Sequence, residues 1–168
     1  GTRWVMTLDD QRGGSLLQRA AHHSDQHTPV SRSANDLAAI LYTSGTTGRS
    51  KGAMLSHGNL SSNASMLKDY WDWRADDVLI HALPIFHVHG LFVAAHGALL
   101  NGSKMIWLPR LDTVQLIKHL PRSTVMMGVP TFYVRLLLDP NFNKGVCKNM
   151  RLFVSGSAPL LTETFNTF

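Results

Sequence analysis

From residue 36 onward, short apolar runs alternate with segments that have the length and spacing of amphipathic helices. The apolar runs predict strands, and the segments between them predict helices. We expect strands over 37–42, 53–56, 78–82, 104–108, 124–129 and 151–155, helices over 59–71, 88–100, 114–120 and 130–138, and the opening of another helix at 160–165. Strands that alternate with helices are typical of an α/β fold, here a layered, mostly parallel sheet flanked by helices.

Residues at the predicted helix ends support these boundaries. Ser56 or His57 precedes the first helix, and Asp112 is placed to cap the helix at 114–120. Pro130 stands in the first turn of its helix, where a missing backbone N–H costs little. Gly102 follows the helix at 88–100, as glycine often does at a helix C-terminus.

The first 36 residues are organised differently. Residues 4–8 predict a short strand, and residues 15–22 predict a helix with apolar positions on one face. Residues 24–35 are polar, contain Pro29 and several serines, and predict a surface linker. We therefore divide the chain into an N-terminal segment with linker, 1–36, and a domain that occupies 37–168.

Composition limits the possible partners. Charged residues make up 16% of the chain, below the roughly 25% typical of soluble domains, so we expect some faces to be covered by other parts of a larger protein. The net charge is +5, but the basic residues are scattered singly, and a surface that follows nucleic acid needs them clustered. We expect no nucleic-acid partner.

The sequence also bears on location. It has no apolar run near the roughly 18 residues of a membrane span, so we expect no membrane partner. Its single cysteine, Cys147, permits no internal disulfide and is consistent with a reducing compartment. We predict a cytoplasmic protein.

The segment richest in chemistry is the loop between the strands expected at 37–42 and 53–56. Residues 42–52 read YTSGTTGRSKG. Three glycines allow a tight turn that exposes backbone N–H groups, four hydroxyl side chains add donors, and Lys51 adds a positive charge. Amides, hydroxyls and a lysine together suit a polyphosphate. A flexible polar linker is the alternative, but apolar strands on both sides argue against it.

The Walker A loop is a sharper alternative, and it fails by position. Counted from Gly45, the second required glycine is Ser50, and the hydroxyl residue required after the lysine is Gly52. We therefore expect a phosphate-binding loop of another kind.

This loop resembles the signature loop of the acyl-adenylating superfamily, which includes acyl-CoA synthetases, peptide-synthetase adenylation domains and firefly luciferase. Two later blocks match in order: LPIFHVHG at 83–90, whose counterpart lies by the acyl pocket, and VSGSAPL at 154–160, whose counterpart lies beside the adenylate. The resemblance implies that a carboxylate attacks the α-phosphate of ATP and that coenzyme A then displaces AMP.

The resemblance also implies roles for individual residues. ATP would be bound by the loop residues Thr43, Ser44, Gly45, Thr46, Thr47, Gly48 and Lys51, and the adenylate by Gly156, Ser157, Ala158 and Pro159. Lys51 and His87 would be catalytic. Mg²⁺ would share the charge of the phosphates, although no cluster of carboxylates is evident to hold it. His87 and His89 form a His-x-His pair, but no third ligand is in sight, and we expect no protein-bound metal.

The acid is suggested by a closer likeness to malonyl-CoA synthetases. It rests on residues 86–90 and on VPTFYVR at 129–135. In such enzymes Arg135 and Ser157, beside His87, would hold the second carboxylate of malonate or methylmalonate. A guanidinium suits a carboxylate, and a buried carboxylate without a partner is costly. Arg135 as a solvated helix residue, a fatty-acyl or aromatic-acyl CoA ligase, and a non-catalytic nucleotide-binding module remain alternatives.

Several blocks of the family are missing. The Tyr-Gly-x-Thr-Glu block, the Thr-Gly-Asp block and the C-terminal domain with its lysine are absent from the 168 residues. We therefore expect residues 37–168 to be a partial adenylating domain, a fragment of the N-terminal domain of its enzyme. On this view its partners are the acid, ATP, coenzyme A and the remainder of the parent enzyme, and it is inactive alone.

Overall fold

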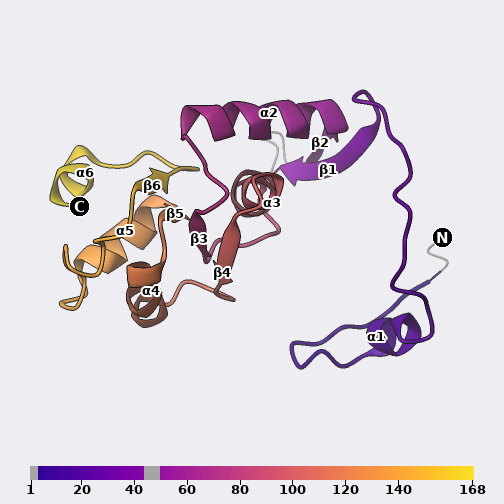
Figure 1. Cartoon of the computed structure of the whole chain (residues 1–168), viewed down its shortest axis with the longest axis horizontal. Coiled ribbons are helices and arrows are strands. Elements are labelled where there is room, and N and C mark those ends of the chain that lie inside the picture. Colours follow the sequence, from indigo (N-terminus) through magenta and orange to yellow (C-terminus); the bar gives the residue numbers. More distant parts are fainter. Residues whose placement is uncertain (1–3, 44–49) are drawn as a thin grey trace. The chain divides into compact units, whose positions relative to one another are not determined.

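The computed structural model describes residues 4–43 and 50–168 of the chain (Figure 1). The contacts within it divide the chain after Arg32 into a small N-terminal unit and a larger unit that begins at Ser33. We describe each unit by itself.

The N-terminal unit contains one short helix, α1 (Ser15–Ala20), and no strand among its described residues. The strand predicted at 4–8 is therefore wrong. The reason lies in Thr7, whose backbone N–H donates to Ser15 Oγ over 3.0 Å and whose carbonyl accepts from the backbone N–H of Leu16. These groups serve the start of α1 instead of a neighbouring strand. None of the described residues in this unit is buried.

The larger unit opens with an antiparallel hairpin. Strands β1 (Leu37–Thr43) and β2 (Lys51–Ser56) pair so that Thr43 lies opposite Lys51 and Tyr42 opposite Gly52. Helix α2 (His57–Tyr70) follows directly. Its N-terminus is held by a reciprocal capping box, in which Ser56 Oγ accepts from the backbone N–H of Asn59 and Asn59 Oδ1 accepts from that of Ser56.

The second sheet has four strands, all parallel. These are β3 (Val78–His81), β4 (Lys104–Trp107), β5 (Val125–Gly128) and β6 (Leu152–Ser155), in the spatial order β4-β3-β5-β6. The two central strands, β3 and β5, are the most deeply buried, because helices and neighbouring strands surround them. The predicted layered and mostly parallel sheet is confirmed.

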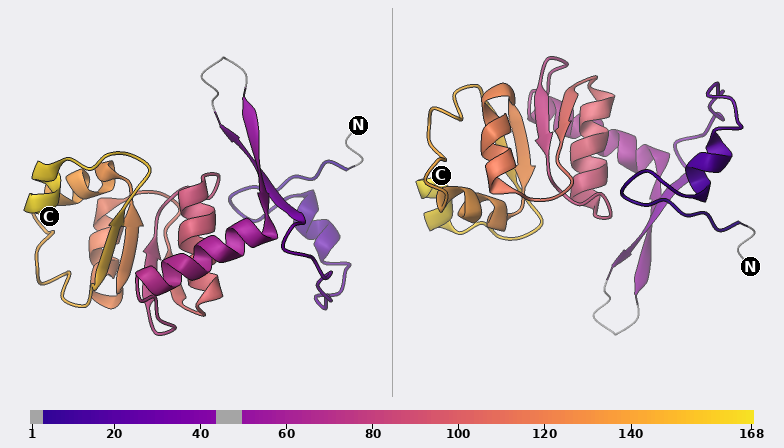
Figure 2. Two further views of the ribbon diagram at one scale, coloured as in Figure 1. Left: turned by 90° about the horizontal axis from the view of Figure 1, so that it is seen from above. Right: turned by 90° about the horizontal axis from the view of Figure 1, so that it is seen from below.

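Helices connect the strands of this sheet, and Figure 2 shows them in two further views. They are η1 (His89–Ala95), α3 (His96–Leu100), α4 (Thr113–His119), the 3₁₀ turn η2 (Leu120–Arg122) and α5 (Pro130–Leu137), and a last helix, α6 (Thr162–Thr167), follows β6. The predicted ends hold at three helices: Asp112 Oδ1 accepts from the backbone N–H of Gln115 over 3.1 Å, Pro130 begins α5, and Gly102 has a positive φ of 66°. The helix predicted at 88–100 begins as the π-helix η1, which periodicity alone does not indicate.

The strand order places a topological switch point between β3 and β5. The chain passes from β3 outward to β4, then returns to the other side of β3 to form β5 and β6. Connections that leave the carboxyl ends of β3 and β5 therefore diverge, which opens a crevice between them. In open α/β sheets such a crevice is the usual place for a ligand.

Candidate functional site

The glycine-rich loop joins the two strands of the hairpin. The pairing of Thr43 with Lys51 closes its base, and Lys51 is the first residue of β2. The predicted phosphate-binding residues Ser44, Gly45, Thr46, Thr47 and Gly48 lie outside the described residues, as does the side chain of Thr43. Binding of phosphate by this loop stays a prediction.

A cavity lies at the switch point of the parallel sheet, with a volume of about 430 Å³. We call it the His87 cavity. Its walls come from the segment after β3 and the segment after β5, with one residue from the loop after β6. The described lining residues are Leu83, Pro84, His87, Val88, His89, Gly90, Val129, Phe132 and Ser157. The structure thus brings together two of the predicted substrate-binding residues, His87 and Ser157, in a mostly apolar space.

One hydrogen bond crosses this cavity from wall to wall. His89 Nδ1 and Ser157 Oγ lie 3.1 Å apart, although 68 residues separate them in the sequence. Burial lowers the pKa of His89, so its imidazole is mainly neutral near pH 7. His87, by contrast, is exposed and packs against Phe86 with 4.7 Å between the ring centroids.

The loop after β6 holds an unusual backbone conformation at the same point. Ser157 has a φ of 68°, in the left-handed region that non-glycine residues seldom adopt. The preceding Gly156 donates its backbone N–H to the carbonyl of Gly128 over 3.0 Å. A Cβ atom on Gly156 would lie 2.9 Å from Cε1 of His89, so only glycine allows the imidazole to approach this closely.

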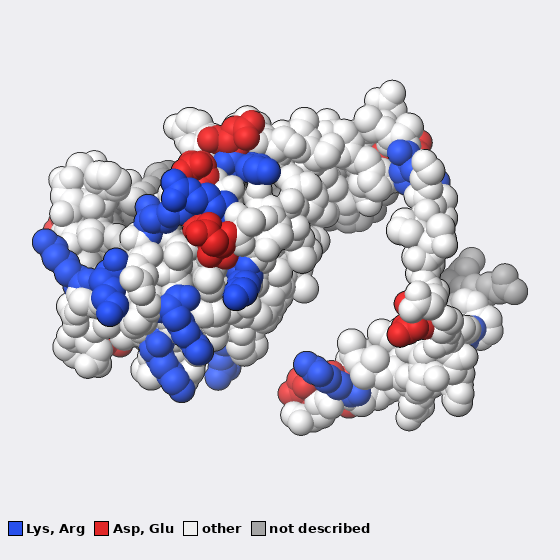
Figure 3. Space-filling model, viewed as in Figure 1, with Lys and Arg blue, Asp and Glu red and all other residues white. Residues whose placement is uncertain are grey.

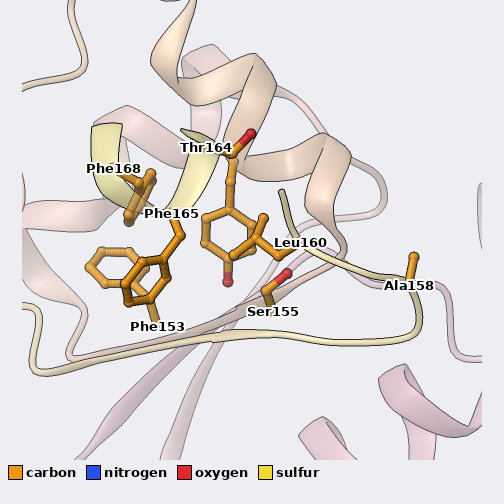
Figure 4. Close-up of a pocket in the computed structure, with 8 residues that line it drawn as sticks. Phe153, Ser155, Ala158, Leu160, Thr164, Phe165 and Phe168 are labelled. Atoms are coloured by element: carbon orange, nitrogen blue, oxygen red, sulfur yellow. The ribbon is translucent and has the colours of Figure 1, made fainter. Parts of the chain in front are cut away.

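Two further hollows meet this loop. The Trp71 hollow, about 340 Å³, is lined by Leu67, Trp71, Val88, His89, Val93, Val154, Gly156 and Ser157. The Phe168 pocket, about 440 Å³, is lined by Tyr133, Phe153, Ser155, Ala158, Leu160, Thr164, Phe165 and Phe168. In Figure 4 the rings of Phe153, Phe165 and Phe168 gather on one side of this pocket, and Ala158 stands at the other.

The predicted adenylate residues are therefore divided among these spaces. Gly156 faces the Trp71 hollow, Ser157 lines both that hollow and the His87 cavity, and Ala158 lines the Phe168 pocket. Pro159 follows on the same exposed loop. The loop after β6 thus lines all three spaces.

Arg135 lies elsewhere. Its exposed side chain borders a shallow hollow of about 460 Å³ that is also lined by Asp112 and Asp139. The structure therefore does not bring Arg135 into the cavity with His87 and Ser157. The two acidic residues in its lining also make this hollow a poor place for an anion. A contact between Arg135 and the acid stays a prediction.

We also looked for charged patches and metal-ligand clusters outside these hollows. On the face drawn in Figure 3, basic side chains lie singly or in small groups, and several stand next to acidic ones. Over residues 4–43 and 50–168 no three His, Cys, Asp or Glu side chains gather in a way that would hold a metal ion. No helix in that part of the chain is both long enough and apolar enough to cross a bilayer.

The sequence did not predict the contact of His89 with Ser157 or the apolar walls of the cavity. His89 was visible only as the second histidine of a His-x-His pair, and nothing local indicated Ser157 as its partner. Val129 and Phe132 were assigned to a strand end and a helix. Their position after β5, at a strand order that only the structure gives, puts them into the cavity.

Comparison with known proteins identifies the class. The sequence profile of the AMP-binding enzyme family matches residues 2–168. The chain belongs to the AMP-binding enzyme family, as the resemblance of its loop predicted.

Individual relatives within the family have more specific names. The chain is 37% identical to the mitochondrial malonate–CoA ligase ACSF3 of Mus musculus. The match covers 86% of this chain and 28% of the mouse protein. The chain is similar in structure to apo MatB from Rhodopseudomonas palustris, with 55% identity and a TM-score of 0.94 over 98% of this chain and 32% of that one. ATP-bound MatB from the same organism gives 56% identity and a TM-score of 0.92, covering 96% of this chain and 32% of that one.

A further solved structure is a malonyl-CoA ligase in a ternary product complex with methylmalonyl-CoA and AMP. It is 37% identical, with a TM-score of 0.75 over 80% of this chain and 30% of that one. The chain thus spans about a third or less of the length of these relatives.

Proposed function

We propose that this chain is part of an ATP-dependent acid–thiol ligase that activates malonate or methylmalonate and transfers it to coenzyme A. The observation that carries the proposal is the 37% identity, over 86% of the chain, with a protein named as a malonate–CoA ligase. The ATP-bound relative and the relative with bound methylmalonyl-CoA and AMP support the same co-substrates.

The chemistry proceeds in two steps. A carboxylate oxygen of the acid attacks the α-phosphorus of ATP, so that an acyl–phosphate bond forms and the bond to pyrophosphate breaks. The sulfur of coenzyme A then attacks the acyl carbon, which forms the thioester and releases AMP. Joining two anions is the physical difficulty, and fixed donors around the leaving pyrophosphate reduce it. In our proposal residues 43–48 and Lys51 provide those donors.

The acid is proposed to occupy the His87 cavity. A volume of about 430 Å³ is ample for a three- or four-carbon acid, and the cavity lies at the switch point where α/β proteins bind ligands. Its polar groups are His87, His89 and Ser157, set among apolar side chains. Such a site can orient a second carboxylate and reject acids that lack one, because its polar groups would then be left without partners.

Magnesium and location are narrower proposals. The described residues contain no cluster that fits Mg²⁺, so we propose that the ion arrives as a ligand of the ATP phosphates.

We also propose a cytoplasmic location, although the mouse relative is named as mitochondrial. Fractionation of the source cells distinguishes the two compartments.

Product analysis tests the proposal. The intact gene product that contains these 168 residues is incubated with ATP, Mg²⁺, coenzyme A and one of four acids: acetate, malonate, methylmalonate or hexanoate. We expect AMP and the matching acyl-CoA by mass spectrometry, with kcat/KM for malonate or methylmalonate at least about 100-fold above that for hexanoate. Preference for hexanoate would favour a fatty-acyl ligase. ATP binding without any acyl-CoA would favour a non-catalytic nucleotide-binding module.

Arg135→Leu tests whether Arg135 helps to recognise the second carboxylate, although its side chain lies outside the His87 cavity. If its guanidinium holds the second carboxylate in the intact protein, Arg135→Leu abolishes malonate turnover and leaves the protein folded. Retained malonate turnover would remove Arg135 from the acid site and leave recognition to the groups of the His87 cavity.

A further inference from the structure

His89 is held in place from two sides. Its Nδ1 lies 3.1 Å from Ser157 Oγ, and its ring packs so closely on Gly156 that a Cβ atom there would meet Cε1 at 2.9 Å. It begins η1, a π-helical segment, and such segments often occur at functional sites. His89 and Ser157 both line the His87 cavity and the Trp71 hollow, so the pair stands between the two spaces.

Ser157 needs such a partner. A residue with a Cβ atom seldom adopts this left-handed backbone conformation, which persists only where surrounding contacts stabilise it. Two contacts link the loop to its surroundings at this point: the hydrogen bond from Gly156 N–H to the carbonyl of Gly128, and the contact of Ser157 with His89. The first fixes the backbone, and the second fixes the hydroxyl.

The direction of this hydrogen bond matters for a carboxylate ligand. A carboxylate only accepts hydrogen bonds, so Ser157 must donate its single O–H to it. The oxygen of Ser157 can then accept from Nδ1–H of His89. The imidazole therefore has to be the tautomer, or the cation, that carries a proton on Nδ1. If Nδ1 lacked its proton, Ser157 would donate to His89 and have nothing to donate to the acid.

We propose that His89 is the positioning residue of the acid site, which holds the Ser157 hydroxyl with its O–H directed at the second carboxylate of the substrate. This inference rests on the proposed function, because it presumes a dicarboxylic acid in the His87 cavity. It adds a residue for which the family resemblance implies no role, and it makes recognition depend on a pair joined across the switch point.

Two isosteric variants give the sharpest test. In the intact gene product, His89→Asn places an amide nitrogen near the position of Nδ1, whereas His89→Gln places it near the position of Nε2. We expect His89→Gln to raise KM for malonate by about tenfold, the effect of one lost hydrogen bond, with KM for ATP unchanged. His89→Asn should stay within about threefold of the wild type. The matched control is His119→Ala, a half-buried histidine outside both hollows that pairs with Arg122, and we expect no change from it.

A double-mutant cycle separates positioning from a structural role. Ser157→Ala alone should raise KM for malonate about as much as His89→Gln, and the double variant should be no worse than Ser157→Ala. Additive losses, or equal losses for Asn and Gln at position 89, would overturn the inference. Melting temperatures check that each variant is folded. If the wild-type protein forms no malonyl-CoA, the proposed function fails and this inference fails with it. If the wild-type protein forms malonyl-CoA but KM for malonate is unchanged in the His89 variants, only this inference fails.

Discussion

Lys51 is the residue on which the proposed adenylation chemistry most depends. It begins β2, opposite Thr43, at the base of the glycine-rich loop. An ammonium there would stabilise charge on the departing pyrophosphate. We expect Lys51→Ala to lower acid-dependent ATP–pyrophosphate exchange by the intact protein by about 100-fold or more, whereas Lys68→Ala, at an exposed site on α2, should leave it unchanged. A rate for Lys51→Ala equal to that of the control would remove this role.

Asp77 predicts a pH dependence of stability. It is 2% exposed, and burial by itself raises the pKa of its carboxyl. Hydrogen bonds from Arg151, Thr124 and the backbone N–H of Arg74 outweigh burial and lower the pKa from 3.8 to about 2. A folded-state pKa below the unfolded one stabilises the protein above pH 3.8, and this contribution is lost as the pH falls toward 2.

The size of this effect is measurable. The shift corresponds to about 2 kcal/mol of unfolding free energy. Urea unfolding at a series of pH values should show that Asp77→Asn removes most of this part of the acid dependence and lowers stability at neutral pH. Asp69→Asn, an exposed position on α2, is the control and should keep the wild-type profile. Parallel curves for Asp77→Asn and the wild type would contradict the assignment.

At the residue scale the sequence predicted a set of residues but not their contacts. His87 and Ser157 were chosen from two separate motifs, and the structure places both in one cavity. The bond between His89 and Ser157 could not be predicted, because it depends on the order of strands that are distant in the sequence. Arg135 illustrates the converse. A guanidinium is a sound partner for malonate, but Arg135 lines a different hollow, together with Asp112 and Asp139, and not the His87 cavity.

At the scale of elements, the capping box of α2 joins the hairpin to the first long helix. Ser56 Oγ accepts from the N–H of Asn59 over 3.1 Å at the point where β2 ends. Ser56→Ala should therefore lower the free energy of unfolding by about 1 kcal/mol. Ser62→Ala, within the same helix, should change it by less than about 0.5 kcal/mol. Equal effects of the two substitutions in urea unfolding would show that the cap does not stabilise the fold.

Most elements were predictable because each carries its own local signal. Apolar runs marked β3 to β6, and Asp112, Pro130 and Gly102 marked helix ends. The failures arose where tertiary contacts decide. The apolar residues near Trp4 have strand character but no partner strand among the described residues. The helix predicted from residue 88 starts as a π-helix that packs closely on the segment after β3. There, a Cβ atom on Gly90 would lie 2.2 Å from the carbonyl oxygen of Pro84.

At the scale of the whole chain, the two units differ in their packing. The described residues of the N-terminal unit include none that is buried, whereas the larger unit has a core that includes Leu79, Ile80 and Met126. Local opening should therefore be far easier in the N-terminal unit. In hydrogen exchange followed by mass spectrometry, we expect amides of α1 to exchange at least about 100-fold faster than those of β5. Comparable protection of α1 and β5 would mean that the N-terminal unit is stabilised by contacts outside itself.

If the protein joins an acid to AMP, as proposed, the adenylation half-reaction can be measured without coenzyme A. The intact gene product is incubated with ATP, Mg²⁺ and labelled pyrophosphate, with malonate, with methylmalonate or with neither acid. We predict that label enters ATP only when malonate or methylmalonate is present. Exchange that no acid stimulates, from a folded protein that binds ATP, would contradict the account.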